Sequence, residues 1–177
     1  MNPKGQRILL IGYGNPGRLD DGLGPALAAC IEGLAIPAVS VESDYQLSVE
    51  HAHDLTNYDV VIFADADLGG NEPFYFRRLI PSVSSGLGSH EVSPGEVVSL
   101  ALTLFGATTQ SYLLGIRGYE FNDFGERLSD MARKNLGAAV DFLSTLIQNG
   151  NFDEAAKEYT GDEEPCIDIC TDKIILN

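Results

Sequence analysis

Short apolar runs alternate with stretches of helical periodicity along this chain, and this alternation limits the possible folds more than any other feature. Five runs have the apolar, β-branched composition of buried strands: residues 7–13, 38–42, 59–66, 74–79 and 110–117. Helical patterns cover residues 26–34, 93–105 and 124–147, with a shorter segment at 48–55. Strands that alternate with helices predict an α/β fold, here a three-layer α/β/α sandwich around a mostly parallel sheet of about five strands.

The chain divides into a folded part and an acidic end. Its 177 residues suit one domain, and we expect an α/β domain over residues 1–149. Residues 150–177 hold eight acidic residues and two lysines, so we interpret them as a weakly ordered, solvated extension. Its Ile174-Ile175-Leu176 end could instead add an edge strand or dock on a partner.

Charge and cysteine content exclude several classes of function. Eleven Lys and Arg against 26 Asp and Glu give a net charge of −15, which disfavours binding to nucleic acid. No apolar run approaches the length of a membrane span, and the run after the basic start is too short for a signal peptide. Three cysteines (Cys30, Cys166 and Cys170) form no disulfide framework, so we expect a cytoplasmic protein with unremarkable thiols and with Cys30 in a buried helix.

A glycine-rich loop follows the first predicted strand. Gly12, Gly14 and Gly17 fit the pattern G-x-G-x-x-G, which is typical of dinucleotide sites, and Glu42 could then bind a ribose. Two features oppose this interpretation. Asp20 and Asp21 would repel a phosphate, and further glycines delay the next helix beyond the loop. A nucleotide-dependent enzyme is thus disfavoured but stays an alternative. A second alternative is that the loop is a structural turn with solvated acids.

Two carboxylates and one imidazole are expected at one edge of the sheet. Asp21 follows the first strand, Asp65 ends the third, and His90 precedes the helix after the fourth. Ligands of open α/β sheets bind at the carboxyl ends of the strands. Oxygen and nitrogen donors there could bind a transition metal and leave positions open for a substrate. Each residue also has an ordinary interpretation, as a turn-capping Asp or a solvated His.

The segment over residues 8–24, ILLIGYGNPGRLDDGLG, resembles the opening of the [NiFe]-hydrogenase maturation endopeptidases. The family pattern is a strand, Gly-x-Gly-Asn, four variable residues, Asp, then Asp or Glu, then Gly-x-Gly. Asp65 and His90 match the family's spaced aspartate and histidine, and the resemblance covers about residues 7–149. The tail with Cys166 and Cys170 lies outside it.

The resemblance implies a specific activity. These enzymes remove the C-terminal extension of the hydrogenase large-subunit precursor after nickel insertion, and the precursor's nickel serves as the recognition element. Carried over, Asp21, Asp65 and His90 would contact that nickel, and the enzyme would need no tightly bound cofactor of its own. An acid after the second strand is a candidate catalytic group; Asp44 is the nearest match and Glu42 a rival.

Signals of ordinary peptidases are missing. The chain has no Gly-x-Ser-x-Gly elbow and no His-Glu-x-x-His helix. The cluster His51-Ala52-His53-Asp54 is interpreted as surface residues, because His53 would point away from the face that His51 and Asp54 share. A non-catalytic protein that binds the precursor remains a further alternative.

Overall fold

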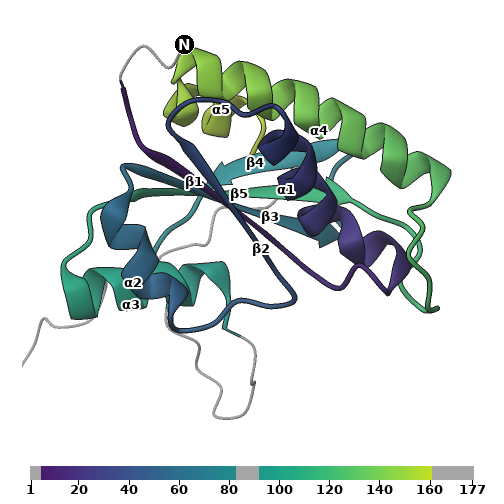
Figure 1. Ribbon diagram of the computed structural model, residues 1–177, viewed down its shortest axis with the longest axis horizontal. Coiled ribbons are helices and arrows are strands. Elements are labelled where there is room, and N and C mark those ends of the chain that lie inside the picture. The colour runs from purple at the N-terminus through teal and green to yellow at the C-terminus, as the bar shows by residue number, and fades with distance from the viewer. Residues whose placement is uncertain (1–4, 83–91, 161–177) are drawn as a thin grey trace, which may run out of the picture.

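A five-stranded sheet between two helical layers forms the centre of the molecule (Figure 1). The computed structural model describes residues 5–82 and 92–160. The strands lie in the order β2-β1-β3-β5-β4. Their bounds are β1 Ile8–Tyr13, β2 Val39–Asp44, β3 Val60–Asp67, β4 Phe74–Arg78 and β5 Gln110–Arg117. Four strands are parallel, and β4 pairs antiparallel with β5 at one edge, so the predicted fold class is confirmed.

Helices cover both faces of this sheet. On one face lie α1 (Leu23–Gly33), α4 (Asp130–Asn149) and α5 (Phe152–Glu158); on the other lie α2 (His51–Asp54) and α3 (Pro94–Phe105). Successive residues of β1 point to opposite faces, as strand geometry requires. Ile8 and Leu10 pack under α1 and α4, whereas Leu9 and Ile11 pack under α2 and α3, and all four are fully buried. This burial on both faces explains the continuous apolar runs.

Two predicted helix starts are displaced in the structure. The first helix begins at Leu23 rather than residue 26, so Pro25 lies inside its first turn. Proline is tolerated there because the N–H groups of the first turn have no hydrogen-bond partner within the helix. The last long helix begins at Asp130 rather than residue 124. Ser129 is its N-cap, with its hydroxyl oxygen accepting from the Ala132 N–H. By contrast, α3 starts where the helical pattern over residues 93–105 predicts it, with Ser93 as the N-cap of a capping box that pairs it with Glu96.

The acidic extension expected from residue 150 begins with a packed helix. Phe152 of α5 is buried in the core beneath the sheet, with its ring 5.7 Å from that of Tyr112. Asp153 accepts hydrogen bonds from the Tyr112 hydroxyl and the Arg78 guanidinium, both at 2.8 Å. The folded part of the chain therefore continues beyond the predicted boundary at 149. The rest of the extension, with both of its cysteines and its apolar end, lies outside the described residues.

Two further expectations concern the burial of Cys30 and the presence of a membrane span. Cys30 lies on the exposed side of α1, so the prediction that it is buried is wrong: the buried face of this helix is formed by Leu23, Leu27 and Ile31. Within residues 5–82 and 92–160, we find no helix that combines the length and the hydropathy of a membrane span.

Candidate active site

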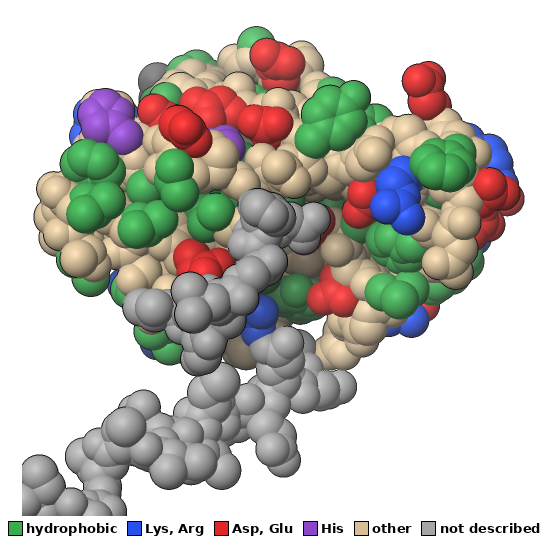
Figure 2. Space-filling model, turned by 90° about the horizontal axis from the view of Figure 1, so that it is seen from below, with side chains coloured by type: hydrophobic (Ala, Val, Ile, Leu, Met, Phe, Trp, Pro, Cys, Tyr) green, Lys and Arg blue, Asp and Glu red, His purple; other side chains and the backbone are tan. Residues whose placement is uncertain are grey.

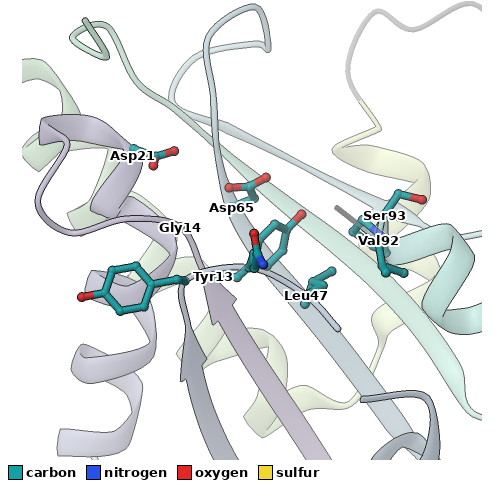
Figure 3. Close-up of a pocket in the computed structure, with 10 residues that line it drawn as sticks. Tyr13, Gly14, Asp21, Leu47, Asp65, Val92 and Ser93 are labelled. Atoms are coloured by element: carbon teal, nitrogen blue, oxygen red, sulfur yellow. The ribbon is translucent and has the colours of Figure 1, made fainter. Parts of the chain in front are cut away.

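A cleft of about 400 Å³ opens at the carboxyl edge of the sheet (Figure 3). It lies where the loops after β1 and β2 and the end of β3 meet the start of α3. Its lining residues are Tyr13, Gly14, Asp21, Tyr45, Gln46, Leu47, Asp65, Val92, Ser93 and Pro94. Two of the three predicted metal-contacting residues, Asp21 and Asp65, thus line one cleft, at the edge where the topology predicted them. The third, His90, lies outside the described residues.

The glycines of the loop are explained by close packing of α1 on the sheet. A Cβ atom on Gly12 would lie 2.8 Å from the Ala28 side chain, and one on Gly24 would lie 2.5 Å from the Ala64 carbonyl oxygen. Gly14 has a φ of 133°, which side-chain-bearing residues rarely adopt. The absence of side chains at Gly12 and Gly24 lets α1 approach the strands, and this packing accounts for both glycines without a bound phosphate.

Asp21 is held at the cleft by the same loop. Its carboxylate accepts a hydrogen bond from the Asn15 backbone N–H at 3.0 Å. That N–H is therefore already used by a carboxylate, in a loop where a nucleotide site would offer its N–H groups to phosphate. Figure 3 shows the Asp21 side chain beside the strand that carries Asp65, so the two carboxylates reach the cleft from separate elements.

Asp65 combines partial burial with hydrogen bonding. Burial, assisted by the neighbouring Asp21 and Asp67 carboxylates, raises the pKa of Asp65 to about 6, against the opposing hydrogen bonds from the Tyr13 hydroxyl and the Ala66 N–H. The Ala66 N–H lies 2.7 Å from the carboxylate. Burial and the same Asp65 carboxylate raise the pKa of Tyr13, which therefore stays a neutral donor. Asp65 can thus exchange a proton in the range where a general base works best.

The sequence interpretation missed Tyr13 as part of this site. The residue was treated as one variable position within the glycine pattern, and no motif distinguishes it. Its position as the last residue of β1, beside the part of β3 that carries Asp65, is the signal that could have found it. Once the two strands are adjacent, their terminal side chains share the carboxyl edge.

Asp20, the neighbour of Asp21, has a different role. It is fully buried and accepts four hydrogen bonds from elements about one hundred residues away in the chain. The donors are the N–H groups of Tyr119 and Glu120 and both the N–H and the hydroxyl of Ser129, at 2.7–2.9 Å. Burial opposes ionisation, but these hydrogen bonds outweigh it and lower the pKa of Asp20.

Asp67, the last residue of β3, is a second carboxylate close to Asp65. The N–H groups of Gly69 and Gly70 donate to this carboxylate at 2.7 and 3.0 Å, and the Tyr75 hydroxyl donates at 2.8 Å. Burial raises the pKa of Asp67, but these bonds and the Arg117 charge reverse the effect and hold it below the usual value. Asp67 therefore shapes the loop after β3 as a fixed anion.

Asp44, the predicted catalytic acid, ends β2 but does not line the cleft, although the next three residues do. Its side chain lies 4.0 Å from Nε2 of His51, which is buried, contrary to the surface interpretation of that cluster. His53 is exposed, as expected. Burial, together with the Asp54 and Asp44 charges, raises the pKa of the rival acid Glu42, which also lies outside the cleft lining.

The described residues provide only part of the predicted metal contacts. No group of three His, Cys, Asp or Glu side chains within residues 5–82 and 92–160 is placed to hold a metal ion. Asp21 and Asp65 form an incomplete pair of oxygen donors beside Val92 and Ser93 of the cleft wall. Such a pair suits a metal whose other ligands come from another molecule.

Comparisons with known proteins identify the fold. No family model and no curated protein matches the sequence. Among solved structures, the [NiFe] hydrogenase maturation protease HycI from Thermococcus kodakarensis is similar at a TM-score of 0.65 and 20% identity, covering 82% of this chain and 95% of that one. The hydrogenase 2 maturation peptidase from a Thaumarchaeota archaeon gives 0.60 and 23%, over 81% and 99%. The hydrogenase maturating endopeptidase HybD from E. coli gives 0.59 and 23%, over 79% and 91%.

These likenesses span nearly the whole length of the compared proteins, and the uncovered part of this chain is about the size of its acidic end. They agree with the resemblance found in the loop over residues 8–24. The chain therefore has the fold of the [NiFe]-hydrogenase maturation proteases.

Proposed function

We propose that this chain is a maturation endopeptidase that removes the C-terminal extension of a [NiFe]-hydrogenase large-subunit precursor after nickel insertion. The observation that carries the proposal is the pair Asp21 and Asp65 in one cleft, on the fold of the hydrogenase maturation proteases. The motif over residues 8–24 supports the same assignment, because its loop places Asp21 at the cleft through the Asn15 N–H.

In this proposal, nickel arrives with the substrate. Asp21 and Asp65 donate carboxylate oxygens to the precursor's nickel, and His90 donates a ring nitrogen. Two carboxylates at the ends of separate elements make an open, modest site, so metal-free precursor would lose part of its binding energy. Neutral Tyr13 keeps the Asp65 carboxylate oriented by donating to it.

A carboxylate then activates the water that attacks the scissile peptide carbonyl. Asp44 is our candidate for this base, because the loop that follows it forms one wall of the cleft. The water's proton would move to the Asp44 carboxylate, and the leaving amine would accept a proton as the peptide bond breaks. The Tyr45 N–H donates to the Asp44 carboxylate at 2.7 Å, and the His51 ring lies 4.0 Å from it.

The test is the intact mass of the cognate precursor after incubation with this protein, with and without nickel loaded. We expect loss of the C-terminal extension only from the nickel-loaded precursor. Asp21→Asn, Asp65→Asn and His90→Ala should each abolish the product. Asp141→Asn, on the exposed surface of α4, is a charge-matched control that should cleave normally.

Other outcomes would reject the proposal in defined ways. Cleavage that survives all three changes would refute the site assignment. Precursor binding without any product would favour the non-catalytic alternative. No binding at all to a correctly folded, nickel-loaded precursor would refute the function itself. Asp44→Asn tests the base separately: normal turnover would exclude Asp44 from the chemistry.

A further inference from the structure

The segment between β5 and α4 lies against the loop that carries Asp21. Three backbone hydrogen bonds join them: Leu19 N–H to Gly125 O at 2.9 Å, Gly125 N–H to Gly17 O at 2.8 Å, and Asp20 N–H to Glu120 O at 3.0 Å. We call residues 118–129 the brace. It closes on a site loop more than ninety residues earlier in the chain, so its contacts are tertiary and not local.

The site loop is strained where the brace holds it. Leu19 has a φ of 54°, in the left-handed region that side-chain-bearing residues disfavour. Its side chain is nevertheless 4% exposed, and a Cβ atom on Gly125 would lie 3.1 Å from it. Backbone strain of this kind persists only where the surroundings over-determine the conformation, and it concentrates at functional sites.

The Asp20 carboxylate is the anchor of this arrangement. Its four donors come from both ends of the brace, Tyr119 and Glu120 at the start and Ser129 at the finish. A buried carboxylate with four donors is rigid, because every displacement lengthens a charge-assisted hydrogen bond. Asp20 therefore fixes the backbone position from which the next residue, Asp21, extends into the cleft.

We propose that Asp20 is a positioning residue that, clamped by the brace, holds the Asp21 carboxylate in its place at the cleft. The geometric claim stands on the described contacts alone, whereas its consequence for turnover rests on the proposed function. Displacing a catalytic contact by about 1 Å can cost two orders of magnitude in rate.

The Asn15 amide gives a direct readout of the Asp21 position, because its N–H donates to the Asp21 carboxylate. We would measure native-state amide exchange by NMR in Asp20→Asn and in the milder Ser129→Ala, which removes one of the four bonds to Asp20. Thr109→Val is the matched control: it deletes hydrogen bonds to the Leu55 and Tyr58 carbonyl oxygens at the opposite edge of the sheet.

We expect Asn15 exchange to accelerate at least about tenfold in both brace variants, under conditions where the slowest β3 amides still report a folded chain. In Thr109→Val it should stay unchanged. Cleavage of nickel-loaded precursor should fall on the order of 10- to 100-fold in the brace variants only. Unchanged Asn15 exchange in Asp20→Asn and Ser129→Ala, or equal acceleration in Thr109→Val, would overturn the proposal.

The two proposals fail separately. If the wild type cleaves no precursor but Asn15 still responds to the brace, the function is refuted and the positioning role stands. If the wild type cleaves and Asn15 does not respond, the function stands and the positioning role is refuted.

Discussion

Substitution of Gly24 by alanine tests whether the glycines serve the packing of α1. An added Cβ atom would lie 2.5 Å from the Ala64 carbonyl oxygen and would also overlap the Tyr13 carbonyl. Both obstacles are backbone atoms of strands β3 and β1, so no side-chain rotation can relieve them. Since ordinary contacts begin near 3.4 Å, the helix would have to withdraw from the sheet by about 1 Å.

The expected magnitude follows from two opposing effects. Overpacking of this kind costs about 1–3 kcal/mol, and the rigid backbone neighbours place Gly24 at or above the upper end. Alanine is a better helix former than glycine by about 1 kcal/mol, which offsets part of the cost. We expect a net loss of about 2 kcal/mol in the free energy of unfolding. With a urea m-value of about 2 kcal/mol per molar, the unfolding midpoint should fall by about 1 M.

Gly137 supplies the control. It lies in the interior of α4, and an added Cβ atom there meets nothing within 4 Å. Gly137→Ala should therefore raise stability by up to about 1 kcal/mol in the same urea titration. If Gly24→Ala were as stable as the wild type, the close seating of α1 would be wrong. If the wild-type protein bound NAD or ATP and Gly24→Ala abolished that binding, the nucleotide alternative would be restored.

Two further predictions concern the protonation of Asp65, and a third concerns the burial of Phe152. The raised pKa of Asp65, about 6 against 3.8, means that the folded chain binds this proton more tightly than the unfolded chain, so the carboxyl lowers stability as pH rises from about 4 to about 6. Asp65→Asn should thus exceed the wild type in free energy of unfolding by about 3 kcal/mol at pH 7 and match it near pH 4; equal stability at both would refute this. Tyr13→Phe should raise the pKa of Asp65 further in an NMR titration, because it removes a donor to the carboxylate. Phe152→Ala should cost about 3–5 kcal/mol in urea unfolding, since the ring is buried; a loss below about 1 kcal/mol would contradict its place in the core.

The sheet and its edge could be predicted from the sequence because each depends on local patterns. Apolar runs located all five strands, and β5 has the predicted bounds. Parallel strands bring their carboxyl ends to one edge whatever their order. Asp21 and Asp65 could therefore be placed together before the strand order was known.

The errors arose where tertiary contacts override local composition. The helical periodicity before Ser129 was misleading, because that stretch is held against the site loop by hydrogen bonds and cannot join α4. The start of the acidic extension was misjudged for a similar reason. Its first turns are acidic in composition, but Phe152, Ala155 and Ala156 share one face of α5 that covers the sheet.

The adjacent acids Asp20 and Asp21 have different roles that the sequence alone does not distinguish. Both are charged residues in one loop, and a pattern treats them alike. In the structure one is buried under four donors and the other faces the cleft with one N–H partner. The difference comes from Tyr119, Glu120 and Ser129, which lie between β5 and α4 and donate to Asp20 across about one hundred residues of sequence. The distant segment thus gives the two neighbouring residues different roles. We expect a chain without the Asp21 carboxylate to stay folded, whereas loss of Asp20 should disturb both the fold and the site.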